Sequence, residues 1–234
     1  SIPGDSTTFL DNFVYNEELR TRGNGYTFKI GFIYRATDFL RLGGAVHTPT
    51  YYDLQDEWAT DITSNFNDGF SETALSPVGE FDYAITSPFR AQGSIAYIIG
   101  KQGLLSAEYE FIDYASARLR SDDANFDVAN DVVRNSYRAT GNLKIGGEWR
   151  LKPFALRAGF AHFGSPYDDG ANNDGSLRSY TFGAGYRQSE FFIDLAYVYT
   201  RKEENLFLYD PSLIESSNIT YTNHNVQLTV GIRL

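Results

Sequence analysis

The amino-acid sequence predicts an all-β fold, a transmembrane antiparallel β-barrel of which this chain supplies about nine strands. Three observations lead to this prediction. Apolar and polar residues alternate with a period of two through most of the 234 residues, whereas helical spacing is nearly absent. The connections between these segments are alternately short and long along the chain, and the long ones are polar. Aromatic side chains border the short connections, where a barrel would meet the membrane surface.

Each predicted strand has an apolar face and a polar face. In the segment YTFKIGFIYR, at 26–35, Phe28, Ile30 and Phe32 fall on one face and Lys29 on the other. The same alternation predicts strands over nine segments: 26–35, 40–47, 89–99, 105–111, 142–150, 154–160, 179–187, 191–200 and 225–234.

The connections alternate in length as regularly as the strands alternate in polarity. The short links lie near 36–38, 100–103, 151–153 and 188–190. The long polar connections lie near 50–82, 115–137, 164–176 and 201–218. Outer-membrane barrels have short turns on the periplasmic side and longer loops outside. The aromatic residues beside the short links predict an interfacial girdle of Tyr34, Tyr97, Trp149, Phe154, Tyr186 and Phe191.

Composition narrows the class of protein further. The formal net charge of -10 argues against nucleic acid as the main partner. No cysteine is present, which excludes disulfides and thiolate metal sites. No apolar run reaches the roughly 18 residues of a membrane helix, but a strand spans the same hydrocarbon with about 9–11 residues. The first residues are neither an initiator methionine nor a signal peptide, so we expect a mature or truncated piece.

A soluble β-sandwich or a lipocalin-like barrel is the alternative fold. The face that carries Arg, Lys, Glu, Gln and Gly is too consistently polar for the packed interior of a sandwich. Bacterial single-chain barrels close on themselves with even strand numbers, and an open edge in lipid would leave backbone groups unpaired. About nine strands therefore predict that further strands come from an N-terminal part, absent here or on a separate chain.

Three stretches of the chain resemble a known family. They are GNGYTFKIGFIYRATDFLRLGGAVHTPTYYDL at 23–54, SPFRAQGSIAYIIGKQGLLSAEYEFIDYASARL at 87–119 and RAGFAHFGSPYDDGANNDGSLRSYTFGAGYR at 157–187. The resemblance is to the outer-membrane transporters of long-chain fatty acids and other hydrophobic compounds (FadL/TodX type). It spans nearly the whole chain and lies in the strand pattern and in these phrases.

The resemblance implies a fourteen-stranded barrel in the bacterial outer membrane, with residues 1–234 as a single C-terminal barrel portion. It also implies an N-terminal hatch and first strands that this chain does not contain. Family members bind hydrophobic molecules at the outer rim, pass them to a pocket and release them sideways into the bilayer. The implied partners are outer-membrane lipid, a hydrophobic small molecule, the N-terminal part of the barrel and other envelope proteins.

The polar face supplies the candidate binding residues. Arg90, Lys144 and Arg157 are the best candidates to hold the carboxylate of an amphipathic ligand, because an arginine fork binds a carboxylate in two places. The alternative is a ladder of ion pairs that braces a hydrated interior. The charged residues expected on this face are Arg90, Glu108, Glu110, Lys144, Glu148, Arg150, Arg157, Arg187, Asp194 and Arg233.

Two prolines, Pro49 and Pro88, interrupt predicted strands. Proline cannot donate to a sheet ladder, so each marks either the end of a membrane section or an opening for a ligand. The residues 122–137 have apolar side chains at loosely helical spacing, which predicts a short loop helix. This helix would pack its apolar side, including Val128 and Val132, over the mouth of the barrel.

Other chemistry is weakly indicated. The segment YDDGANNDGS, at 167–176, has oxygen ligands that suit calcium, but its spacing does not fit an EF-hand and such clusters are common in turns. The histidines His47, His162 and His224 lie in separate segments, and no nucleophile elbow is present. We therefore expect no catalytic residue, no metal and no cofactor. The predicted function is passive uptake of hydrophobic molecules, and a porin-like or structural barrel in an envelope assembly is the alternative.

Overall fold

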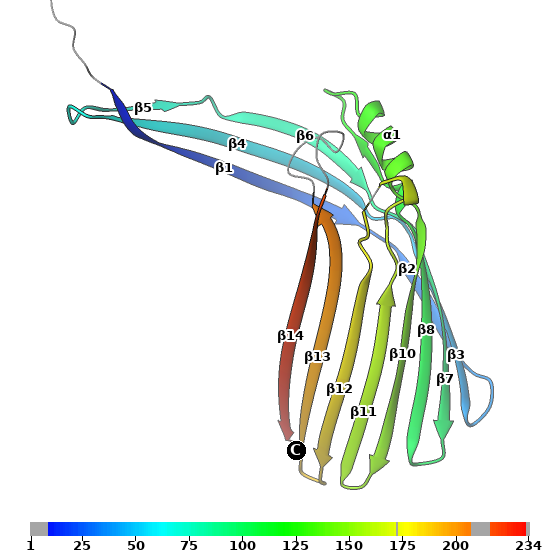
Figure 1. Cartoon of the computed structure of the whole chain (residues 1–234). Coiled ribbons are helices and arrows are strands. Elements are labelled where there is room, and N and C mark those ends of the chain that lie inside the picture. The colour runs from blue at the N-terminus through cyan, green and yellow to red at the C-terminus, as the bar shows by residue number, and fades with distance from the viewer. Residues whose placement is uncertain (1–8, 172, 207–215, 233–234) are drawn as a thin grey trace, which may run out of the picture. The chain divides into compact units, whose positions relative to one another are not determined.

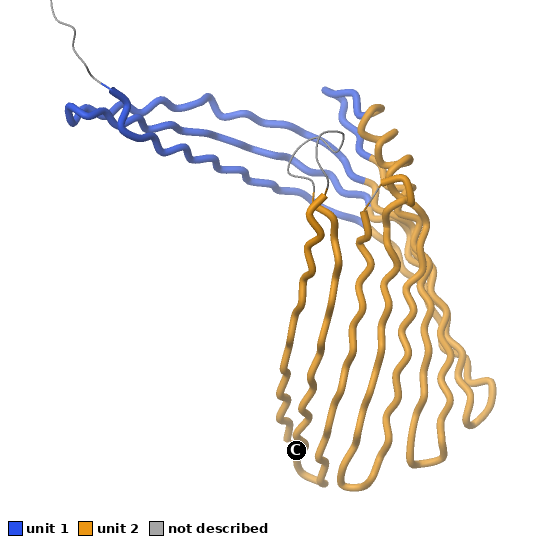
Figure 2. The backbone as a smooth tube through the Cα atoms, in the orientation of Figure 1, with its two compact units in different colours: residues 1–26, 51–85, 119–126 blue, residues 27–50, 86–118, 127–234 orange. Residues whose placement is uncertain are grey.

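The structure is a computed structural model that describes residues 9–171, 173–206 and 216–232. The described residues form fourteen β-strands in two sheets, which confirms the all-β class. The chain divides into two compact units (Figure 2). Unit 1 holds residues 1–26, 51–85 and 119–126, and unit 2 holds 27–50, 86–118 and 127–234.

Unit 2 is built around a nine-stranded antiparallel sheet, whose strands correspond to the nine predicted segments (Figure 1). The strand order is β14-β13-β12-β11-β10-β8-β7-β3-β2. The strands are β2 (Lys29–Arg35), β3 (Leu40–His47), β7 (Arg90–Ile99), β8 (Gly103–Asp113), β10 (Ala139–Leu151), β11 (Phe154–Phe163), β12 (Leu177–Arg187), β13 (Phe191–Leu206) and β14 (Ser217–Ile232). Residues 233–234 of the last predicted strand, including Arg233, lie outside the described residues.

Tight turns join the strands in pairs at one end of this sheet. The turns cover 36–39, 100–102, 152–153 and 188–190, close to the predicted short links. Gly100 adopts a positive φ of 53°, a conformation that favours glycine, in the turn between β7 and β8. Each turn joins two antiparallel strands of the same sheet, so all four turns lie at the same end. The predicted alternation of short and long connections is confirmed for unit 2.

Most of the large apolar side chains of unit 2 lie together on one face of the sheet, and that face is exposed. Phe182, Leu195 and Leu228 retain 58%, 48% and 67% of their accessible surface. In the described part of the chain only two apolar residues, Ile112 and Ala155, are buried. No second layer of the described residues packs on this face, as it would in a β-sandwich.

Unit 1 contains a second sheet in a region where the sequence predicted a loop. The expected polar connection 50–82 instead holds three strands, and another strand precedes β2. The sheet follows the order β1-β4-β6-β9, and β5 pairs with β4. Its strands are β1 (Leu10–Tyr26), β4 (Tyr51–Phe66), β5 (Ser71–Leu75), β6 (Gly79–Thr86) and β9 (Arg118–Arg120).

The reason for this error is visible in β4. Leu54, Trp58 and Ile62 fall on one face of β4, as the period of two requires. Asp56 and Thr60 fall on the same face and interrupt its apolar character. The interruption hides the period of two, whereas the sixteen-residue pairing with β1 depends on backbone hydrogen bonds that do not need an apolar face.

Both prolines mark strand breaks, as predicted. Pro49 lies between β3 and β4, and Pro88 lies between β6 and β7. Next to them, the amide of Thr50 donates to Ser87 Oγ at 2.8 Å and the amide of Ser87 donates to the Thr50 carbonyl at 2.9 Å. The chain passes from one unit to the other beside these prolines.

The predicted loop helix is present as α1 (Asp127–Ser136) in unit 2. Two residues of its expected apolar side, Val128 and Val132, do not pack against the described residues, because they are 78% and 55% exposed. The segment after the helix meets the next long connection, where the Tyr137 and Tyr167 rings stack with their centroids 5.3 Å apart. Burial raises the pKa of the Tyr167 hydroxyl at this contact. No helix in the described ranges combines the length and the apolar character needed to cross a membrane.

Replacing Gly23 with alanine tests the pairing of β1 with β4. A Cβ at this position would lie 2.2 Å from the backbone oxygen of Asp53, so the strands would have to separate locally. We expect Gly23→Ala to cost about 1–3 kcal/mol, the usual range for overpacking, and to speed hydrogen exchange of β1 and β4 by about tenfold or more. Gly93→Ala is the control, because its Cβ would meet no atom within 4 Å. Equal exchange rates in the two variants would contradict the pairing.

Candidate functional site

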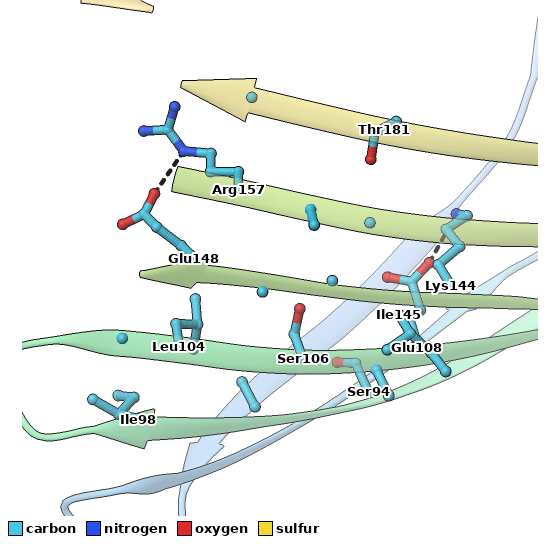
Figure 3. Close-up of a pocket in the computed structure, with 18 of the residues that line it drawn as sticks. Ser94, Ile98, Leu104, Ser106, Glu108, Lys144, Ile145, Glu148, Arg157 and Thr181 are labelled. Atoms are coloured by element: carbon cyan, nitrogen blue, oxygen red, sulfur yellow. Dashed lines mark hydrogen bonds and ion pairs between the residues drawn. The ribbon is translucent and has the colours of Figure 1, made fainter. Parts of the chain in front are cut away.

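The polar face of unit 2 lines an open hollow of about 1060 Å³. Residues from eight of the nine strands line it, every strand except β14, so the sheet curves toward its polar face. Figure 3 shows Ser106, Glu148 and Thr181 among the side chains that surround it.

A chain of ion pairs crosses four strands at one side of the hollow. Arg157 lies at its centre, donating from Nε to Glu148 Oε2 and from Nη1 to Asp194 Oδ1, both at 2.7 Å. Arg150 binds the other oxygen of Glu148 at 2.5 Å, and Arg187 approaches Asp194 Oδ2 at 3.4 Å. Three cations thus share two carboxylates. Arg157 is directly opposite Glu148 in the register of β10 and β11, so the sheet itself sets the geometry of the central pair.

A second ion pair lies farther along the same face. Lys144 Nζ donates to Glu108 Oε1 at 2.9 Å, from directly opposite positions on β10 and β8 (Figure 3). Both side chains remain partly exposed, at 44% and 34%. The pair therefore faces the hollow rather than a dry core.

A more buried polar pair joins the same two strands. Asn142 Nδ2 donates to Glu110 Oε2 at 2.8 Å, and both residues are buried. Asn142 Oδ1 accepts from the amide of Gly164 at 3.3 Å. Arg90 lies 3.9 Å from the other oxygen of Glu110, which gives the buried carboxylate a cation as well as an amide donor.

The three head-group residues predicted from the sequence are thus all on the polar face, but they do not form one cluster. Lys144 and Arg157 line the hollow, whereas Arg90 is not among its lining residues. Each of the three has a carboxylate within 4 Å. This arrangement favours the bracing interpretation for them. Sequence reasoning did not single out Arg41, which also lines the hollow.

The floor of the hollow consists of small residues. Gly146 and Gly159 are directly opposite each other on β10 and β11, and Thr181 follows on β12. Ser106 continues the row on β8. Because side chains this short leave the centre of the face open, the charged groups stand at the sides of a space that a small molecule can enter.

A smaller depression of about 570 Å³ lies on the opposite, apolar side of the sheet. Gly44 and Gly93 are directly opposite each other at its centre, and the Phe32 ring lies over Gly44. Tyr109 and Phe111 contribute to its lining from β8. It follows that the exposed apolar face is not smooth, because paired glycines leave a gap between aromatic side chains.

The remaining sequence candidates have local structural roles. In the acidic loop, Asp174 accepts hydrogen bonds from the amide and hydroxyl of Ser176, and Asp169 pairs with Arg138 at 2.5 Å. Across residues 9–171, 173–206 and 216–232, no group of three or more histidine or acidic residues is arranged to hold a metal ion. His224 Nδ1 lies 2.7 Å from the Tyr197 hydroxyl on the apolar side, away from the hollow.

Comparisons with known proteins add no family assignment. No protein-family model matches the chain, and no curated protein matches it significantly. The resemblance to the fatty-acid transporters therefore stays a prediction, and the site must be interpreted from its own geometry.

The central position of Arg157 is testable with a double-mutant cycle. Arg157→Gln leaves Glu148 and Asp194 without their shared partner, and we expect a loss of about 1–3 kcal/mol of unfolding free energy. In combination with Asp194→Asn, the interaction energy should lie within about 0.5–3 kcal/mol. Urea unfolding followed by tryptophan fluorescence measures both.

Arg150→Gln is the matched control for this cycle. Arg150 is 55% exposed and binds one carboxylate only, so its loss should cost less than about 1 kcal/mol. Equal stability of the Arg157→Gln and Arg150→Gln variants would contradict the bracing role of the ion-pair network.

Proposed function

We propose that this chain is the C-terminal portion of a bacterial outer-membrane β-barrel that takes up hydrophobic or amphipathic small molecules, such as long-chain fatty acids, by passive transport. One observation carries the proposal. The sheet of unit 2 exposes its apolar face and curves its charged face around a hollow. A soluble sheet would arrange these faces the other way round.

The exposed apolar face of unit 2 is unfavourable in water unless something covers it. Each square ångström of apolar surface left in water costs roughly 25 cal/mol, and monomeric soluble proteins rarely expose contiguous patches above a few hundred Å². Hydrocarbon removes this cost without a second protein layer. The polar face needs the opposite environment, and a water-filled interior supplies it.

The apolar face is long enough to cross most of the roughly 25 Å apolar band of an outer-membrane barrel. On β13 this face runs from Phe191 to Tyr199, eight residue steps that cover about 26 Å along the strand and about 20 Å at a tilt of roughly 40°. Aromatic rings occur at both ends of this stretch. Near the turns, Tyr186 lies within 6 Å of both Phe154 and Phe191; at the far end, Tyr180 lies 5.2 Å from Phe160 and 6.2 Å from Tyr199. Two such bands support the proposed girdle.

The open edges of the sheet support a partner for the barrel. In the described chain β2 and β14 are the edge strands of the nine-stranded sheet, and β1 is an edge strand of unit 1. Unpaired backbone groups cost several kcal/mol each in lipid. We therefore propose that further strands, from an N-terminal part of the same polypeptide or from a separate chain, pair with β2 and β14. The family resemblance would set the total at fourteen.

The chemistry of the hollow supports passive transport. Its floor of Gly146 and Gly159 is open, and charged pairs stand beside it. An amphipathic molecule could bind with its polar end at the charged groups and move down its concentration gradient. A porin-like or structural role is the second candidate, and the pairing of Arg90, Lys144 and Arg157 with carboxylates favours it.

The orientation of the two faces can be tested with neighbouring residues on β12. Phe182→Arg would put a charge in the hydrocarbon at a cost of about 2–4 kcal/mol, and we expect a lower yield of trypsin-resistant protein after folding into lipid vesicles. Thr181→Arg, one residue earlier and opposite Gly159 of the floor, should fold with nearly wild-type yield. If Phe182→Arg folded as well as Thr181→Arg, the proposed lipid contact would be wrong.

The two functional candidates differ in the solute that the protein would let across the membrane: a hydrophobic acid for the transporter, and ions for a porin-like barrel. Vesicles that contain the complete barrel should accelerate entry of dodecanoate, measured with an internal pH-sensitive dye, without a large ion conductance in planar bilayers. High conductance with no acceleration of dodecanoate entry would favour the porin-like candidate. Protein-free vesicles correct for spontaneous flip-flop of the acid.

A further inference from the structure

We propose that Arg35 and Arg41, which are opposite each other at the turn end of the polar face, form the site that binds the carboxylate of an amphipathic ligand. Arg41 lines the hollow, and Arg35 lies beside it, outside the lining. This inference rests on the proposed uptake function and identifies the head-group site within it. The site differs from the three cations predicted from the sequence.

Sheet register places the two arginines together. Arg35 ends β2, Arg41 is the second residue of β3, and the two are directly opposite each other across the turn 36–39. Opposite residues of an antiparallel pair point to the same face, with Cβ atoms about 4.5–5.5 Å apart. Arg41 is opposite Ala96, which is opposite Ser106 of the floor, so this shared face is the polar one.

These arginines lack the carboxylate partners that their neighbours have. Within the described residues, neither forms an ion pair within 4 Å, including with Asp38 in the turn that joins their strands. Five other cations on this face have carboxylates: Arg90, Lys144, Arg150, Arg157 and Arg187. Two like charges directly opposite each other repel, and an anion bound between them would remove the repulsion.

Apolar side chains beside the arginines indicate an amphipathic ligand rather than an inorganic anion. Ile33 is two residues before Arg35 on the same face and is 81% exposed. Ile98 and Leu104 are directly opposite each other on β7 and β8 and line the same hollow. The amide of Ile98 donates to the Phe39 carbonyl at 2.7 Å, which holds this apolar pair next to the turn.

The chemistry of recognition follows from these neighbours. A guanidinium group offers parallel N–H donors that match the two oxygens of a carboxylate, and two such groups can bind both oxygens. An alkyl chain attached to that carboxylate would contact Ile33, Ile98 and Leu104 and then the small residues of the floor.

Binding of dodecanoate by the protein in lipid nanodiscs tests the site. Equilibrium dialysis at pH 8 with radiolabelled dodecanoate, corrected with empty nanodiscs, gives Kd for the wild type and for Arg35→Gln/Arg41→Gln. We expect the double variant to weaken dodecanoate binding at least tenfold and to change dodecanol binding less than twofold. Arg35→Lys/Arg41→Lys should restore part of the affinity, because it keeps the charge and loses the fork.

Lys29→Gln is the matched control, since it removes one cation from the same face of β2, six residues from Arg35. It should leave Kd unchanged. An unchanged Kd in the double arginine variant would overturn the site, and so would a tenfold loss in Lys144→Gln or Arg157→Gln alone. Inorganic phosphate that competes as well as dodecanoate would overturn the amphipathic ligand class. Wild-type protein that binds neither dodecanoate nor dodecanol would instead overturn the proposed function.

Discussion

The exposed apolar face of unit 2 is the constraint on which the interpretation of this protein depends. Phe182, Leu195 and Leu228 lie on it with about half or more of their surface accessible, although water is the worst solvent for them. The charged residues are on the reverse side, paired around a hollow. The proposed function gives each face a matching environment, with an apolar medium outside and water inside. The proposals of a membrane location, a closed barrel and an internal binding site all follow from that one requirement.

The sequence predicted the sheet of unit 2 well because its alternation is nearly uninterrupted. Each of the nine segments became a strand, and Pro49 and Pro88 lie at strand breaks. Unit 1 was missed for a physical reason. Acidic residues such as Asp56 in β4 and Glu17 in β1 occupy positions on the otherwise apolar side, so its strands do not show a clean period of two. Long backbone ladders stabilise them regardless, and a reading based on side-chain polarity cannot detect such ladders.

The site was predictable only in part. Alternation assigns a face to every residue, so it placed Lys144 and Arg157 correctly beside the hollow. It does not say which cation has a carboxylate neighbour, because that depends on the pairing of residues on different strands. Arg35 and Arg41 could have been recognised, since they are nearly symmetrical about a short turn and must therefore be opposite each other. The absence of an acidic partner within the described chain is information that only the assembled sheet provides.

The Glu148–Arg157 ion pair also helps to fix the alignment of β11 with β10, which the alternation of polar and apolar residues does not determine by itself. If β11 slipped by two residues against β10, every side chain would keep its face, and the apolar pattern would not resist the error. In one direction of slippage Arg157 would stand opposite Arg150, and in the other it would stand opposite Gly146. Both misalignments lose the ion pair, and the first replaces it with repulsion. The ion pair therefore favours the same alignment as the two-residue turn that joins β10 and β11, so side-chain charge and turn length specify one register together.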